Sequence, residues 1–256
     1  VPILRGDEKI KTTYGQIIFL SALLADFLTL ILATVYASVI KTDGFTLNNL
    51  NVVVYFLVIF LLLRLLRRAA WWYPDLFKRL FDANDPEEMG IRGSLALMLS
   101  VVGLSVLFDI EPILGAFLSG TIFALVFPNR GSLDISMKGF SYGFLIPIFF
   151  INVGLNYDIQ ILTNSTFYFE VLILFCLAIF VKLVPSFFMY FFGIKIREIF
   201  AGGLLLSARF SLIIAMAEIG LELGLLSQKV ESEIIFLAAL TATFAPIGYK
   251  FFSIKK

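Results

Sequence analysis

The sequence contains no histidine and a single cysteine, Cys176. These absences exclude zinc sites built from His and Cys, His-based catalytic triads and disulfide frameworks. Charged residues are only 15% of the chain and the formal net charge is +1, so there is no basic excess to bind nucleic acid. Any function must therefore rest on carboxylates, amines, hydroxyl groups and the backbone.

Apolar residues are abundant instead. They make up 60% of the 256 residues, including 29 Phe, whereas soluble domains hold about 45–50%. This composition cannot be buried in one globular core and predicts an all-α polytopic membrane protein that binds the lipid bilayer. We find no phosphate loop, zinc-protease or aspartyl-protease motif, so a transporter is favoured over an enzyme.

Eight runs are long and apolar enough to be candidate membrane-spanning helices. They lie at 15–40, 50–67, 93–109, 112–128, 139–156, 167–192, 198–224 and 232–253. Between the second and third runs, residues 69–92 combine Trp, Tyr, Lys and Arg, which predicts a cytoplasmic linker lying at the membrane interface. With both chain ends in the cytoplasm, nearly all Lys and Arg residues fall on the cytoplasmic side, and only Lys41 and Lys229 on the opposite side.

Asp26 lies in the middle of the first run. A charge inside the bilayer is costly, so an intramembrane carboxylate is a functional hypothesis by default. Helical spacing places Ala22, Thr29 and Ala33 on the same face, which leaves room for water or an ion. We expect Asp26 and Thr29 to bind a cation or a proton, with Asp26 as the transient metal ligand. The alternative is a neutral Asp26 hydrogen-bonded to a neighbouring helix.

Two basic residues also lie inside candidate spans. Lys182, three residues before Pro185, is expected to pair with a carboxylate, to lose its proton or to snorkel to the interface. Arg209 lies in a polar cluster with Ser207 and Ser211, which predicts a broken helix lining a cavity. The alternative is a continuous helix whose Arg209 caps a neighbour's carbonyl end.

Three glutamates lie near the external ends of the spans. Glu218 and Glu222 are one helical turn apart and are interpreted as a possible vestibule rather than the site itself. Glu170, near the start of the sixth run, is interpreted as a solvated residue at a helix end.

Four segments, in this order, resemble the monovalent cation:proton antiporter-2 family, which includes sodium/proton antiporters and Kef-type potassium efflux proteins. They are YGQIIFLSALLADFLTLILATVYA at 14–37, ILGAFLSGTIFA at 113–124, FLIPIFFINVGLNYD at 144–158, and the region from Lys182 through Ser207-Ala208-Arg209. The resemblance covers nearly the whole chain, so residues 1–256 are expected to form a partial exchanger-like transmembrane domain.

The resemblance implies inverted repeats, with a dimerisation panel and a mobile core that carries crossed, unwound helices. Asp26 would bind Na⁺, K⁺ or Li⁺ in competition with H⁺, Lys182 would balance the charge of the core, and Ser207-Ala208-Arg209 would be the break in one crossed helix. The implied protein is a homodimer in a prokaryotic inner membrane, with no cofactor beyond the transported ions. The expected function is exchange of a monovalent cation, Na⁺ more than K⁺ or Li⁺, for protons.

Two departures from the family pattern matter. Ala25 stands where the family commonly has a polar or acidic residue before the aspartate. The first repeat is expected to precede Val1, so an alternative is a non-transporting fragment or a subunit that needs a separate N-terminal half. A Kef-like potassium efflux pathway is a further alternative.

Overall fold

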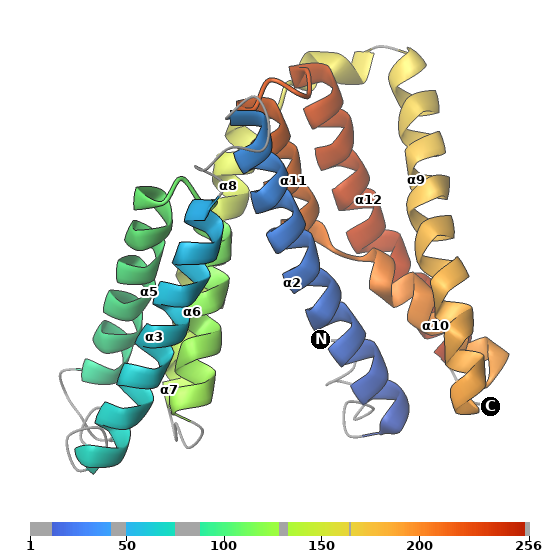
Figure 1. Ribbon diagram of the computed structural model, residues 1–256. Coiled ribbons are helices and arrows are strands. Elements are labelled where there is room, and N and C mark those ends of the chain that lie inside the picture. Colours follow the sequence, from blue (N-terminus) through green and yellow to red (C-terminus); the bar gives the residue numbers. More distant parts are fainter. Residues whose placement is uncertain (1–11, 42–49, 75–87, 128–132, 164, 254–256) are drawn as a thin grey trace. The chain divides into compact units, whose positions relative to one another are not determined.

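The computed structural model describes residues 12–41, 50–74, 88–127, 133–163 and 165–253 (Figure 1). Within these ranges every regular element is a helix, which confirms the all-α prediction. The elements are α2 (Thr13–Lys41), α3 (Leu50–Trp72), α5 (Met89–Leu107), α6 (Pro112–Val126), α7 (Leu133–Phe140), η3 (Ser141–Leu145), α8 (Ile146–Asn156), η4 (Ile159–Thr163), α9 (Ser165–Ser186), η5 (Phe187–Phe192), α10 (Ile196–Ser207), α11 (Phe210–Glu222) and α12 (Gln228–Ser253).

The described residues contain six helical stretches that are long and apolar enough to cross a membrane, and the bent pair of α10 and α11 makes up to seven. The 15-residue helix α6 is apolar but shorter. Each of the eight predicted runs overlaps one of these helical stretches. Of the predicted interfacial linker, the first residues continue helix α3 as far as Trp72, and residues 75–87 lie outside the described residues.

The chain divides into two compact units. The terminal unit comprises residues 1–28 and 157–256, and the middle unit comprises residues 29–156. Helix α2 contributes its first half to the terminal unit and its second half to the middle unit.

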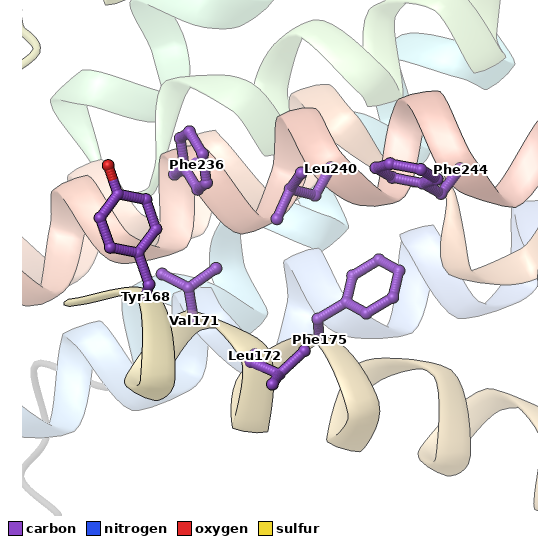
Figure 2. Close-up of a pocket in the computed structure, with 7 residues that line it drawn as sticks. All are labelled: Tyr168, Val171, Leu172, Phe175, Phe236, Leu240 and Phe244. Atoms are coloured by element: carbon purple, nitrogen blue, oxygen red, sulfur yellow. The ribbon is translucent and has the colours of Figure 1, made fainter. Parts of the chain in front are cut away.

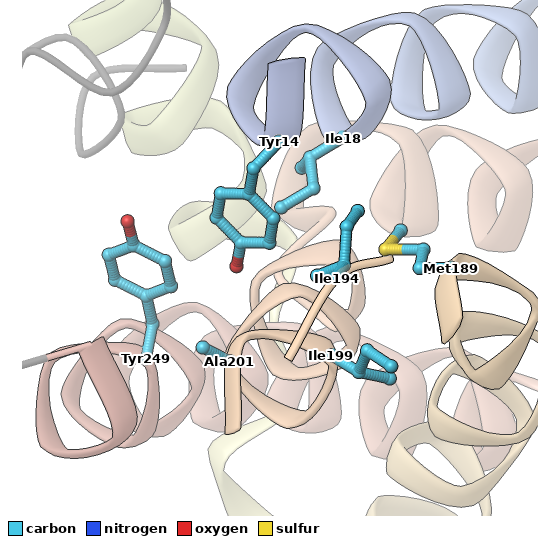
Figure 3. Close-up of a cluster of buried hydrophobic side chains, with 7 residues drawn as sticks. All are labelled: Tyr14, Ile18, Met189, Ile194, Ile199, Ala201 and Tyr249. Atoms are coloured by element: carbon cyan, nitrogen blue, oxygen red, sulfur yellow. The ribbon is translucent and has the colours of Figure 1, made fainter. Parts of the chain in front are cut away.

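In the terminal unit, the start of α2 packs against α10, η5 and the end of α12 through a cluster of buried side chains (Figure 3). The members are Tyr14, Ile18, Met189, Ile194, Ile199, Ala201 and Tyr249. The Tyr14 hydroxyl also donates a hydrogen bond to the carbonyl oxygen of Glu198, at 2.9 Å. This contact joins segments 184 residues apart in the chain and fixes α2 beside α10.

Two consecutive glycines allow α10 to pack closely on two sides. A Cβ atom on Gly202 would lie 3.0 Å from Ile18 Cδ1 of α2. A Cβ atom on Gly203 would lie 2.7 Å from Leu183 Cδ2 of α9. Small residues are what let helix backbones approach closely in membrane proteins, so α10 lies between α2 and α9 because of this pair.

In the middle unit, α5 and α6 form a tight helical hairpin. Asp109, with φ of 56°, makes the turn, and Pro112 starts α6 in the first helical turn, where its missing N–H costs nothing. The helices touch where a Cβ atom on Gly115 would lie 2.8 Å from Ser105 Oγ. Helix α3 packs on this hairpin through buried Tyr55, whose ring centroid lies 6.0 Å from that of Phe108.

Candidate functional site

The seventh predicted span is broken in the structure. Helix α10 ends at Ser207, α11 begins at Phe210, and their axes differ by 42°. Ala208 (φ −80°, ψ 73°) and Arg209 (φ −115°, ψ 63°) leave the helical region, and the Arg209 N–H bonds to the Ser207 carbonyl oxygen at 3.0 Å. The regular ladder of bonds between residues four apart is therefore interrupted where the polar cluster lies.

The side chain of Arg209 extends from this break to α2. Its Nη1 lies 2.6 Å from Asp26 Oδ1, forming a charge-assisted hydrogen bond, and its Nη2 donates to the Ala22 carbonyl oxygen at 3.4 Å. The Arg209 side chain is 12% exposed and the Asp26 side chain is 39% exposed. The carboxylate is thus held by an internal cation but is still partly exposed.

Lys182 is the second cation of this site. It lies on α9, half-buried, and interacts electrostatically with both Arg209 and Asp26. No described carboxylate lies within ion-pair distance of its ammonium group. An ion pair with a carboxylate, one of the alternatives expected for Lys182, is thus found for Arg209 instead, where the sequence did not predict it, and Lys182 contributes a positive charge to the surroundings of Asp26.

These three side chains come from α2, α9 and the α10–α11 break, all within the terminal unit. Two positive groups surround one carboxylate, so a monovalent cation that binds Asp26 must compete with Arg209. The Nε atom of Arg209 is buried and has no hydrogen-bond partner among the described residues. The guanidinium is therefore held through its Nη atoms alone. Its Nε atom makes no hydrogen bond that would have to break if Arg209 released Asp26.

The other predicted site residues, Ser207, Ser211 and Thr29, are not among the described partners of this ion pair. Ser207 is buried and donates through Oγ to the Gly203 carbonyl oxygen at 3.0 Å, which ends α10. Ser211 is exposed in the first turn of α11. Thr29 lies three residues beyond Asp26 on α2, where that helix already belongs to the middle unit.

The two vestibule candidates, Glu218 and Glu222, are both exposed on α11. Glu218 interacts electrostatically with Glu231 of α12. Neither has a described ion-pair partner, so this end of α11 carries unneutralised negative charge.

A charge network at the N-terminal ends of α9 and α12 was missed by sequence reasoning. The Lys229 ammonium lies 2.6 Å from Glu170 Oε2 and 3.3 Å from Glu233 Oε1. Glu170 is thus an ion-pair partner and not merely a solvated residue. The spacing of four residues between Lys229 and Glu233 was a local signal for half of this network.

A pocket of about 290 Å³ lies between α9 and α12 in the terminal unit (Figure 2). It is lined by Tyr168, Val171, Leu172, Phe175, Phe236, Leu240 and Phe244. This apolar lining offers no ligand that a small cation prefers. In the described part of the chain, no group of three or more Asp, Glu or Cys residues could hold a metal ion, so the cation candidate is the single carboxylate of Asp26.

Comparison with known proteins gives the same class. A family model for the transmembrane region of sodium/hydrogen exchangers matches residues 1–255. The chain is 33% identical over 261 residues to YjbQ of Bacillus subtilis, which is named as a candidate Na⁺/H⁺ antiporter. It is 28% identical over 259 residues to Na⁺/H⁺ antiporter 3 of Methanocaldococcus jannaschii, also named as a candidate, and 26% identical over 254 residues to the Na⁺/H⁺-K⁺ antiporter GerN of Bacillus cereus.

These alignments cover 98%, 99% and 98% of this chain, but only 40%, 64% and 63% of the three relatives, respectively. The chain therefore spans between two fifths and two thirds of the length of the curated relatives it matches. The matches and the apolar helices together identify a multi-pass integral membrane protein, and the matched family and relatives are named as exchangers or antiporters rather than as enzymes. The chain belongs to the sodium/hydrogen exchanger transmembrane family.

Proposed function

We propose that this protein exchanges a monovalent cation for protons by alternating access, with Asp26 binding the cation and the proton in competition. Na⁺ is the favoured cation because Na⁺ stands in the names of all three relatives, with K⁺ as the alternative that the name of GerN suggests. The observation that carries the proposal is the 2.6 Å pairing of Asp26 with Arg209 at a broken helix.

The physical reason is the cost of moving a bare carboxylate through a membrane. An isolated charge in the bilayer is expensive, so Asp26 must be neutralised whenever the site changes sides. A proton, a bound cation or the Arg209 guanidinium can each neutralise it. Coupling requires that the site changes sides only after Arg209 has released Asp26 to a cation or a proton, so that the Arg209-paired state stays in place and each crossing carries one of the two ions.

We assign supporting roles to the other candidates. Thr29 would supply a hydroxyl oxygen beside Asp26, and Lys182 would balance the charge of the core. Ser207 and Ser211 would border the helix break, which in transporters of this kind exposes backbone dipoles to an ion. Glu218 and Glu222 would attract cations to the external mouth through their exposed negative charge.

The arrangement of the whole protein is also part of the proposal. Both chain ends would be cytoplasmic, the protein would be a homodimer of the prokaryotic inner membrane, and the transported ions would be its only small-molecule partners. Because the chain spans only part of its relatives' length, the alternative of a subunit that requires a separate N-terminal half is kept. A Kef-like potassium efflux pathway ranks below both.

The test is cation-induced proton release from proteoliposomes that contain this chain and an internal pH dye. Na⁺, K⁺ and Li⁺ are added in turn, with and without any separately encoded N-terminal half. Dequenching that depends on the cation and disappears in Asp26→Asn supports exchange at Asp26. Exchange that persists in Asp26→Asn would refute the proposed site, and activity only with the added half would assign the chain as a subunit.

A further inference from the structure

The end of helix α3, in the middle unit, carries three arginines and two tryptophans on one face. Steps of three or four residues lead from Arg64 to Arg67 and Arg68, and from these to Trp71 and Trp72. All five side chains are exposed, with Trp71 at 80% and Trp72 at 56%. The side of α3 that packs inside the unit is the opposite one, so this face is not used in the fold of the middle unit.

Helical spacing shows where the packed face of α3 lies relative to the arginines. Its buried residues are Val52, Tyr55 and Ile59. At about 100° per residue, Arg64 and Arg68 lie roughly 120–180° from them, whereas Arg67 lies roughly 60–120° away and borders the packed face. Tyr55 is completely buried against the α5–α6 hairpin. The orientation of the arginine face is therefore fixed by packing.

The same outward face continues toward the start of α3 as an apolar surface. Val53, Leu57, Phe60 and Leu61 are exposed along it. Leu57 precedes Arg64 by seven residues, which is about 10 Å along a helix axis. One face of α3 thus changes from aliphatic and aromatic side chains to guanidinium groups, as a phospholipid changes from acyl chains to phosphate, and the adjoining tryptophans are the residues typical of the membrane–water interface.

Two of the three guanidinium groups, those of Arg64 and Arg68, lie over aromatic rings. The Arg64 guanidinium carbon lies 4.9 Å from the ring centroid of Phe60, and that of Arg68 lies 4.8 Å from the Trp72 ring. No described carboxylate forms an ion pair with any of the three arginines. Stacking orients a guanidinium plane and leaves its N–H donors in the plane available for an oxyanion.

We propose that Arg64, Arg67 and Arg68 bind the phosphate of an anionic phospholipid whose acyl chains lie along the exposed apolar face of α3. Arginine matches phosphate with paired N–H donors, and three positive charges without an ion-pair partner among the described residues favour a lipid of net negative charge over a zwitterionic one. The adjacent apolar face favours a lipid over free phosphate, because only a lipid fills both parts of the surface.

A simpler explanation is that these arginines only set the orientation of the helix in the membrane. That effect depends on the number of positive charges near the end of a span, so lysine serves it as well as arginine. Lysine, however, is a point charge that neither stacks in the same way nor forks toward a phosphate. Replacing the three arginines with lysines therefore separates a lipid site from an orientation signal.

The chain's two tryptophans are both in this face, so intrinsic fluorescence reports on it directly. The protein is placed in phosphatidylcholine vesicles with a minor fraction of phosphatidylglycerol, and in matched vesicles with the same overall composition. In one set only the phosphatidylglycerol is brominated near the headgroup end of its acyl chains. In the other set an equal amount of the phosphatidylcholine is brominated instead. We expect several-fold stronger quenching by the brominated anionic lipid, and a decrease of this excess as salt is raised.

Three variants complete the test. The excess should disappear in the triple variant Arg64→Ala, Arg67→Ala, Arg68→Ala and should fall clearly in the corresponding triple lysine variant. It should be unchanged in Arg197→Ala, which removes an exposed arginine of the terminal unit. Equal quenching by both lipids in the unaltered protein, or an excess that is retained in full by the triple lysine variant, would overturn the proposal.

Discussion

The two units of the chain treat charge differently. In the terminal unit, Asp26 and Arg209 pair in the middle of membrane-length helices, with Lys182 nearby. In the middle unit, the described ion pair joins Lys41, the last residue of α2, to Glu111 at the start of α6, at 3.8 Å. Its arginines on α3 lie at the end of that helix.

The charges of the middle unit have structural or interfacial roles, whereas the charges of the terminal unit are placed where ion chemistry can occur. A pair at helix ends can be solvated and contributes little, whereas a charge at membrane depth is retained only if the protein uses it. The terminal unit also contains the helix break and the close glycine contacts of α10. We therefore place ion exchange in the terminal unit and anionic-lipid binding in the middle unit.

The largest effect is expected from Asp26→Asn, which should reduce cation-induced proton movement to the level of protein-free vesicles. Asparagine can still accept a hydrogen bond from Arg209 but cannot exchange a proton for a cation, so folding should be retained. The measurement is dye dequenching in proteoliposomes together with thermal unfolding in detergent. The matched control is Glu111→Gln in the middle unit, and equal loss in both variants would remove the distinction between the units.

Arg209→Gln should lower the cation concentration that gives half-maximal exchange at alkaline pH. Removing a positive charge 2.6 Å from the carboxylate removes an internal competitor. We expect a decrease of roughly tenfold, which corresponds to about 1.4 kcal/mol. Cation titrations of proteoliposomes measure it, with Arg197→Gln as the control. An unchanged or increased half-saturating concentration would show that Arg209 does not compete with the cation.

Gly203→Ala should destabilise the terminal unit by about 1–3 kcal/mol, because the added methyl group would overpack the contact with Leu183 of α9. Thermal unfolding in detergent measures the change. The control is Gly120→Ala in α6, where nothing lies within 4 Å of the added atom. There, alanine should be neutral or stabilising by up to about 1 kcal/mol. Similar effects of the two variants would mean that α10 is not packed as closely as described.

Lys41→Ala is expected to have the smallest effect, less than about 1 kcal/mol on stability and none on exchange. The Lys41 side chain is 49% exposed although that of Glu111 is only 9% exposed, and the 3.8 Å between their charged groups is beyond hydrogen-bond distance, so the pair contributes little. The same unfolding and exchange assays apply. If Lys41→Ala abolished exchange, the ion pair of the middle unit would have to take part in transport, contrary to our account.

The sequence was sufficient for the fold because apolar runs bounded by charges and prolines determine where membrane-length helices lie. The break of the seventh span was also visible, since Ser207 and Arg209 interrupt an apolar run and expose its backbone. Membership of the exchanger family followed from short segments spread over the chain.

The pairing within the site could not be predicted in the same way. Asp26 and Arg209 are 183 residues apart, and which basic residue reaches the carboxylate depends on how α2, α9 and the break pack together. The sequence pointed to Lys182 as the residue that would pair with a carboxylate, and to Arg209 only as part of the helix break. The pairing of Glu170 with Lys229, 59 residues apart, was hidden for the same reason.

The most direct test of the central claim is the pH dependence of cation binding to the purified chain. Because Na⁺ and H⁺ compete for Asp26 in our account, the apparent affinity for Na⁺ should fall as the pH is lowered, and Na⁺ binding at acidic pH should release protons. Both effects should vanish in Asp26→Asn and persist in Glu111→Gln. Na⁺ binding of unchanged affinity and pH dependence in Asp26→Asn would contradict the assignment of Asp26 as the shared site.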